Sequence, residues 1–143
     1  WLFGVVPGIG LAPINEMFHR AALSNRLTIM QWLYGKYPQI SFDSIKSGGL
    51  IHFCKHNSID VLKWLVQAKP SIEFDHKEIA FNTACENSNL EIADFILELY
   101  PEIDISNGDE HVFRYACANG HLDVAKWLIE IKPDIFINND EQF

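Results

Sequence analysis

Four prolines divide the chain into segments of nearly equal length, and this spacing constrains the fold more than any other feature. They are Pro38, Pro70, Pro101 and Pro133, and the three intervals between them differ by a single position. Six residues before each proline stands a large aromatic residue: Trp32, Trp64, Phe95 and Trp127. Other repeat positions keep the same register. One of them is apolar in every copy, with Phe18, Leu50, Phe81 and Phe113. So many matching columns predict a stack of short structural repeats, each contacting only its neighbours.

The copy that ends at Pro133 predicts two helices joined by a tight turn. Apolar residues within 113–117 have helical spacing, and Asn119-Gly120 then supplies the left-handed conformation that ends a helix. The apolar residues of 122–131 predict a second helix, which the proline stops. An extended loop follows, with apolar residues two and four positions after each proline. We therefore expect an all-α solenoid of helix-turn-helix units, with the aromatic residue before each proline buried.

The segment 116–128, Ala-Cys-Ala-Asn-Gly-His-Leu-Asp-Val-Ala-Lys-Trp-Leu, resembles the helix-turn-helix part of an ankyrin repeat. The resemblance covers essentially the whole chain. The tryptophan and the proline that follows it are similar to those of the divergent ankyrin arrays of giant DNA viruses and their amoebal hosts. Residues 111–114 depart from the family's Thr-Pro-Leu-His opening. The resemblance implies that His121 bonds backbone groups between helices and across to the next repeat.

The repeat register divides the chain into six pieces. They are the end of a preceding repeat (1–17), four ankyrin-like repeats (18–49, 50–80, 81–112 and 113–138) and the start of a further repeat (139–143). We therefore expect a monomeric segment of a longer array. The copy at 50–80 is divergent, because Phe53 stands where the other copies have alanine. Its bulk predicts a changed stacking angle around residues 50–57.

Charge excludes several classes of partner. The 143 residues include 11 Lys and Arg against 19 Asp and Glu, a formal net charge of −8. Nucleic acids and anionic membranes both attract basic surface, so we expect neither as a partner. Three widely spaced cysteines do not form a disulfide framework and suit a reducing compartment. We therefore expect a cytoplasmic protein, in the host cytoplasm if the resemblance to viral arrays reflects its source.

Metal and catalytic chemistry find little support in the residues. Cys54, Cys85 and Cys117 share one repeat position, so they lie one helix pair apart and cannot converge on one ion. We expect all three to be buried as small apolar side chains. His52 and His56 share a helix face, but the glutamate and third ligand of a His-Glu-x-x-His site are missing. We predict no catalytic residue, no cofactor and no metal site.

Acidic residues gather between the proline of one copy and the next helix. Eleven of the 19 carboxylates lie there: Asp43, Glu73, Asp75, Glu78, Glu102, Asp104, Asp109, Glu110, Asp134, Asp140 and Glu141. Lys46 and Lys77 are the only Lys or Arg residues in the same stretches. Stacking would align these stretches along one edge, where their charge would steer a basic protein partner. The alternative is that the charge keeps a long array soluble.

The first helix of each repeat offers a second candidate surface, since its non-core positions vary between copies while the framework repeats. Arg114 and Tyr115 are the expected anchors, because Arg and aromatic residues dominate interface hot spots. The predicted partner-binding residues are therefore Arg114, Tyr115, Glu73, Asp75, Glu102, Asp104, Asp109 and Glu110. The ankyrin resemblance implies a non-enzymatic module that binds a protein, and the alternative is a structural spacer within a longer array.

Overall fold

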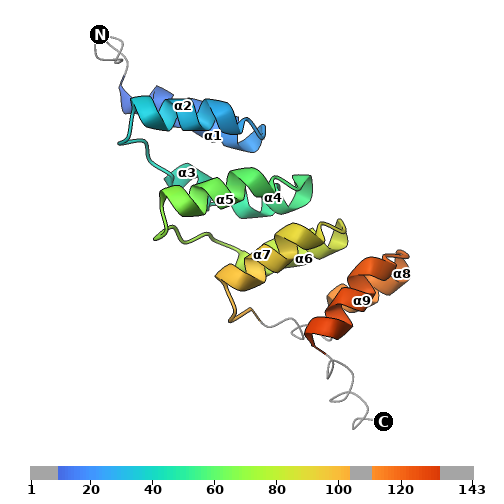
Figure 1. The fold of residues 1–143 in the computed structure, drawn as a ribbon. Helices are drawn as coiled ribbons and strands as arrows, with labels where there is room; N and C mark the ends of the chain where they lie inside the picture. Colours follow the sequence, from blue (N-terminus) through green and yellow to red (C-terminus); the bar gives the residue numbers. More distant parts are fainter. Residues whose placement is uncertain (1–9, 104–110, 133–143) are drawn as a thin grey trace.

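Helices joined by short turns and loops make up the part of the chain that the computed structural model describes, residues 10–103 and 111–132 (Figure 1). The helices are α1 (Leu11–Leu23), α2 (Leu27–Lys36), α3 (Asp43–Lys46), α4 (Gly49–His56), α5 (Ile59–Ala68), α6 (Lys77–Glu86), α7 (Leu90–Leu99), α8 (His111–Ala118) and α9 (Leu122–Ile131). No strand occurs in these ranges. The predicted all-α solenoid is therefore confirmed.

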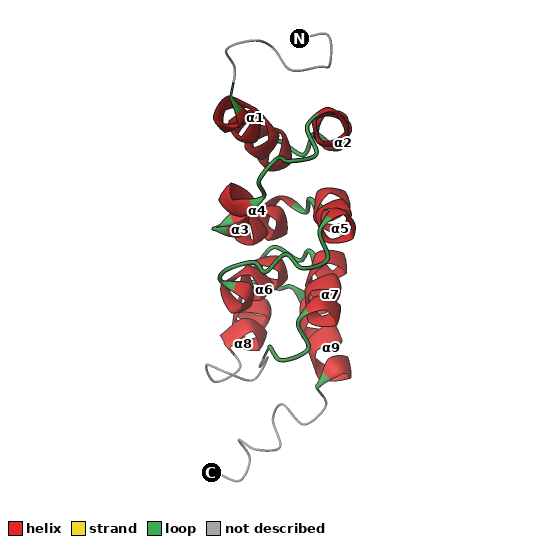
Figure 2. Cartoon of the chain, turned by 90° about the vertical axis from the view of Figure 1, so that its left-hand side faces the viewer, coloured by secondary structure: helices red, strands yellow, loops and turns green. Residues whose placement is uncertain are grey.

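The helices form four stacked units, which we number from the N-terminus: α1–α2, α3–α5, α6–α7 and α8–α9. In Figure 2 the first helices α1, α4, α6 and α8 stand in one column, and the second helices α2, α5, α7 and α9 stand in another. The first helices also contact one another along the stack, α1 with α4, α4 with α6 and α6 with α8. The piece boundaries expected at 17/18, 49/50, 80/81 and 112/113 fall within α1, α4, α6 and α8.

A left-handed residue ends the first helix of every unit. It is Asn25, Asn57, Ser88 or Gly120, with φ between +54° and +74°. In each unit the residue that follows it donates its N–H to the same carbonyl column, as in His121 N to Ala116 O at 2.8 Å. This bond satisfies a carbonyl that the helix end leaves free. The turn predicted at Asn119-Gly120 is confirmed, and the other three units repeat it.

The prolines that follow α2, α5 and α7 each start a tight turn into the loop. At Pro38, for example, the backbone N–H of Ile40 donates to the carbonyl of Tyr37 at 3.0 Å. Ile40 and Phe42 then point into the core, and the residue between them stays partly exposed. The same alternation buries Ile72 and Phe74 in the second unit. Ile135 and Ile137, which the repeat assigns to the same role, lie outside the described residues.

The second unit contains a broken helix in place of the continuous one in the first unit. Residues 11–23 form α1, and the equivalent positions of the next repeat are covered by α3 and α4 together. Gly48 interrupts them with φ +84°, a conformation that glycine adopts without a steric penalty. Asp43, expected in a linking segment, is instead the first residue of α3.

Phe53 is completely buried in α4, although the other units have alanine at this position. The residue one helical turn earlier compensates for the added volume of the Phe53 ring. It is Gly49, where the other units have Met17, Ala80 and Val112. A Cβ on Gly49 would lie 3.8 Å from the Phe53 ring and 3.0 Å from a methyl group of Ile45. The second unit thus packs differently, through an exchange of volume between positions i and i+4 of one helix face.

The aromatic column before the prolines was expected to be buried, and this expectation is wrong. Trp32 is 60% exposed, and the other three members of the column are half-buried. The ring of Trp64 packs on Phe18 and Tyr34 of the preceding unit, at centroid distances of 6.1 and 5.6 Å. The column therefore lies between units, and Trp32 belongs to the first described unit, where no described helix pair packs on it.

Candidate interaction surface

Carboxylates from successive loops meet at one lysine on the edge of the stack. Glu73 lies in the loop before α6, Glu102 follows α7, and both are exposed. Lys77 Nζ is 2.9 Å from Glu73 Oε2 and 3.7 Å from Glu102 Oε1. The loops of the second and third units are therefore adjacent, as the acidic edge requires.

Lys77 also rests on an aromatic ring, which holds its ammonium group in place. Its Nζ lies 4.2 Å from the centroid of the Tyr100 ring, a cation–π contact. The hydrogen bond to Glu73 raises the pKa of the Lys77 ammonium above its usual value. Burial raises the pKa of the Tyr100 hydroxyl. Lys77 thus stays charged and neutralises part of the acidic edge, a pairing that the i, i+4 spacing of Glu73 and Lys77 could have indicated.

Asp75, the one further acidic candidate within the described ranges, lies in the same loop as Glu73. Asp75 is exposed, and its backbone N–H donates to the carbonyl of Lys46 at 3.1 Å, which joins the loop before α6 to the end of α3. Lys46 Nζ is in turn 3.7 Å from a carboxylate oxygen of Asp43. Both lysines of the edge are therefore paired within the protein. Three further candidates, Asp104, Asp109 and Glu110, lie outside the described residues.

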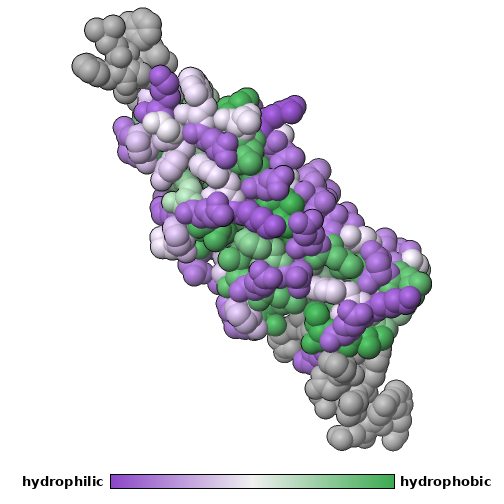
Figure 3. Space-filling view, in the orientation of Figure 1, coloured by the Kyte–Doolittle hydropathy of each residue, from purple (hydrophilic) through white to green (hydrophobic). Residues whose placement is uncertain are grey.

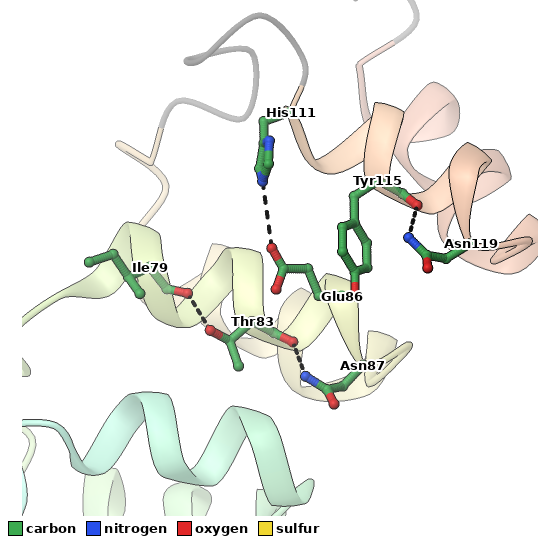
Figure 4. A network of polar contacts seen from close by, with 7 residues as sticks. All are labelled: Ile79, Thr83, Glu86, Asn87, His111, Tyr115 and Asn119. Atoms are coloured by element: carbon green, nitrogen blue, oxygen red, sulfur yellow. Dashed lines mark hydrogen bonds and ion pairs between the residues drawn. The ribbon is translucent and has the colours of Figure 1, made fainter.

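The first helices α6 and α8 carry a set of polar contacts at their exposed ends (Figure 4). Asn87 Nδ2 donates to the carbonyl of Thr83 at 2.8 Å, and Asn119 Nδ2 donates to the carbonyl of Tyr115 at 2.9 Å. These asparagines occupy the same position in their units and bond carbonyls in the last turn of each helix. They therefore stabilise helix ends.

Arg114 and Tyr115 lie on α8 in different environments. Arg114 is exposed, whereas Tyr115 is half-buried and extends from α8 towards α6 (Figure 4). The Tyr115 ring stacks on His121 at a centroid distance of 6.3 Å with 8° between the planes. Nearby, His111 Nε2 lies 3.7 Å from Glu86 Oε1 across the two helices, an ion pair when His111 is protonated. Arg114 is thus available to a partner, and Tyr115 also contributes to packing.

Polar side chains at the turns connect each unit to its neighbour. His52 Nε2 lies 2.7 Å from the carbonyl oxygen of Leu23, and Asn89 donates to a backbone carbonyl at the end of α4 at 2.6 Å. His121 Nδ1 lies 2.7 Å from Ser88 Oγ. The His121 side chain therefore bonds a hydroxyl of the preceding unit, and the contact expected towards the next repeat lies outside the described residues.

The repeated order of helix, left-handed turn, helix and proline loop agrees with the comparison to known families. A family model described as ankyrin repeats in three copies matches residues 18–109 and 50–140. The chain belongs to the ankyrin-repeat family. No curated protein and no solved structure matches it significantly. Ankyrin repeats generally mediate protein–protein interaction, and the family is typically non-enzymatic.

The cysteines of this ankyrin-repeat chain are all free thiols with unequal exposure. Cys54 and Cys85 are buried, and burial raises the pKa of each thiol to about 12. Cys117 is exposed, so the expectation that all three are buried is wrong. It occupies the same column, but in the last unit described no further helix pair covers it.

Thiol labelling is expected to separate these cysteines. At about pH 8, near the usual thiol pKa, a chromogenic disulfide reagent should modify Cys117 rapidly in dilute folded protein, because only Cys117 is accessible. Cys54 and Cys85 should react only after urea unfolding. Absorbance would give one thiol per folded chain and three per unfolded chain. Rapid modification of three thiols without urea would contradict the burial of Cys54 and Cys85.

The two histidine rings of the second unit lie close together, and one of them is hydrogen-bonded to the first unit. The rings of His52 and His56 are 4.4 Å apart between centroids, and His52 Nε2 is hydrogen-bonded to the carbonyl of Leu23. Across residues 10–103 and 111–132, no three His, Cys, Asp or Glu side chains are grouped so that they could hold a metal ion. In the same ranges, every helix is too short or too polar to span a bilayer.

Proposed function

We propose that this ankyrin-repeat chain is a non-enzymatic module that binds a protein partner with basic surface. The partner would contact the acidic loop tips and the exposed positions of the first helices. The observation that carries the proposal is the approach of Glu73 and Glu102, from successive loops, to the single ammonium of Lys77. Loops that meet in this way would present their carboxylates as one edge.

Charge supports a basic partner more than a neutral one. Glu73, Asp75 and Glu102 are all exposed, and one lysine balances only part of their charge. An acidic edge attracts basic side chains over about a Debye length, roughly 8–10 Å at physiological salt. It would therefore raise the association rate and favour partners rich in Lys or Arg. Exposed Arg114 would add a contact on the first-helix face.

A cytoplasmic location is part of the proposal, in host cells if the source is viral. Free Cys54, Cys85 and Cys117 are consistent with a reducing compartment. The alternative function is a spacer that sets distance and curvature within a longer array. Contacts within the protein favour that alternative, because Lys77 already pairs with Glu73 and Glu102.

Removal of the edge charge is the test of the proposal. The variant Glu73→Gln/Asp75→Asn/Glu102→Gln keeps similar side-chain volumes and removes three negative charges. At about 0.5 kcal/mol for each exposed charge contact, we expect a loss of roughly tenfold in affinity for the captured partner. Affinity capture from cell lysate would identify the partner, and titration calorimetry with that purified protein would give the affinity.

The matched control removes the same number of charges from the second helices. Asp94, Glu98 and Glu130 are exposed on α7 and α9, and Asp94→Asn/Glu98→Gln/Glu130→Gln should leave the affinity within about twofold. Equal losses for both variants would indicate a non-specific charge effect and would contradict recognition by the loop edge. Failure of the unaltered chain to capture any protein would favour the spacer.

A further inference from the structure

One large apolar side chain is exposed in the interior of the stack. All other exposed large apolar residues within the described ranges belong to the first and last described units: Leu11, Met17, Ile29, Trp32, Leu122, Ile129 and Ile131. Figure 3 shows hydrophobic surface over α2 and α9 of these two units. Ile79 on α6 is 54% exposed, although α4 packs on one side of α6 and α8 on the other. The exposure of Ile79 is therefore not due to the lack of a neighbouring unit.

The repeat does not require an apolar side chain at this position. The equivalents of Ile79 are Glu16, Gly48 and His111. Figure 4 shows Ile79 at the start of α6, where its carbonyl accepts a hydrogen bond from the Thr83 hydroxyl at 2.8 Å. A single exposed apolar residue is ordinary on a protein surface, so the surroundings of Ile79 decide its meaning.

Ile79 lines a hollow at the start of α6. The hollow has a volume of about 470 Å³ and is lined by residues 74–79. Asp75 and Glu78 are exposed at its walls, and neither forms an ion pair within the described part of the chain. Lys77 is also at the wall, but Glu73 and Glu102 balance its charge. The hollow therefore combines unpaired negative charge with an exposed apolar side chain.

Contacts to both neighbouring elements hold the loop that forms the hollow. The backbone N–H of Asp75 donates to the carbonyl of Lys46 at 3.1 Å, at the end of α3. The backbone N–H of Phe74 donates to the hydroxyl of Tyr100 at 3.5 Å, beyond α7. A site that is already formed loses less conformational entropy when a ligand binds.

The third unit alone combines these features within residues 10–103 and 111–132. In the first unit the equivalents of residues 74–79 are the first residues of α1. In the second unit they include α3, and Gly48 stands in place of Ile79. The equivalents in the fourth unit, apart from His111, lie outside the described residues. The hollow is therefore a feature of this unit and not of the repeat.

Charge along the stack favours this unit as the place where a basic segment binds. The described residues before Pro70 include seven Lys and Arg against three Asp and Glu. From Pro70 onwards the described residues include four Lys and Arg against ten Asp and Glu. The charge thus changes sign along the stack just before the hollow. A basic segment would be repelled by the first two units and attracted to the third.

We propose that the hollow binds an extended segment of a protein partner, in which one apolar residue is flanked by Lys or Arg. The apolar side chain would pack on Ile79, and the basic side chains would pair with Asp75 and Glu78. An extended segment places alternate side chains on the same side, about 7 Å apart, so basic and apolar side chains can enter the hollow together. This inference rests on the proposed function and names the chemistry of the segment that the acidic surface would bind.

Binding of a fluorescein-labelled peptide, Lys-Lys-Leu-Lys-Lys, is the first test, with fluorescence anisotropy as the measurement. We expect the serine version, Lys-Lys-Ser-Lys-Lys, to bind about tenfold more weakly, because it buries no large apolar side chain. Ile79→Ser should weaken binding of the leucine peptide by a similar factor and leave the serine peptide unaffected. The matched control is Ile29→Ser, since Ile29 is 48% exposed on α2, and it should bind the leucine peptide like the unaltered chain.

Nuclear magnetic resonance of isoleucine methyl groups would locate the bound peptide. The Ile79 signal, assigned from its absence in Ile79→Val, should shift when the leucine peptide is added, while the Ile29 signal should not. Equal affinity of the two peptides, or equal losses for Ile79→Ser and Ile29→Ser, would overturn the contact with Ile79. If the edge variant Glu73→Gln/Asp75→Asn/Glu102→Gln then weakened both peptides, the proposed function would still stand. Failure of the unaltered folded chain to bind the leucine peptide would overturn the inference, whereas the captured partner would test the proposed function separately.

Discussion

Trp64→Ala is expected to lower the free energy of unfolding by about 2–4 kcal/mol, while the effect of Trp32→Ala should stay within about 0.5 kcal/mol. The two residues occupy the same repeat position, but Trp64 packs on the rings of Phe18, Tyr34 and Phe42. Truncation of a fully buried tryptophan costs about 3–5 kcal/mol. Trp64 is only half-buried, so the expected loss of stability is smaller. Trp32 is 60% exposed, so its truncation removes few contacts.

Urea unfolding followed by far-ultraviolet circular dichroism would measure both values. The unaltered chain, Trp64→Ala and Trp32→Ala should share one slope with denaturant if each unfolds cooperatively. Comparable losses for the two variants would contradict the placement of this column between units. They would instead favour the uniform burial that the sequence register alone predicts.

Phe53→Ala is expected to destabilise the protein by about 3–5 kcal/mol, although it makes the second unit more like the other three. Phe53 is completely buried, so its truncation leaves a cavity in the protein core beside α4. Gly49 contributes no side chain to refill it, whereas the other units have Met17, Ala80 and Val112 at that position. In the third and fourth units the alanine is accompanied one turn earlier by a larger buried neighbour, Ala80 or Val112.

The conservative change Phe53→Leu serves as the control for this prediction. It retains most of the apolar volume, so we expect a loss of only about 1–1.5 kcal/mol. The same urea titrations would supply both values. A neutral or stabilising effect of Phe53→Ala would show that the repeat pattern outweighs local packing. It would also contradict the exchange of volume between Gly49 and Phe53.

Local features of the fold were predictable because each depends on a few adjacent residues. Asn119-Gly120 predicted a left-handed turn, and Gly120 has φ +74°. The proline stops were predictable for a similar reason, since proline restricts its own backbone and that of the residue before it. The break at Gly48 was harder to predict, because a glycine pair is compatible with a loop as well as with an interrupted helix.

The candidate surface was predictable in its location and less so in its contacts. The spacing of the repeats indicated that loop carboxylates lie along one edge, and Glu73 and Glu102 do meet there. Their common contact with Lys77 joins residues from loops of different units, so no local pattern contains it in full. Tyr115 was expected as an anchor for a partner, yet it also stacks on His121 within the protein.

The order of amino acids was enough to predict the repeat, the two helices of each unit, the turn between them and the ankyrin family. These depend on spacing and on backbone preferences, which act within the length of a single repeat. Which members of one column are covered became clear from the packing of the units. Trp32 and Trp64 have the same place in the register, and Cys54 and Cys117 share another, yet their exposure differs. The physical reason is that burial in a stack depends on whether a neighbouring unit is present.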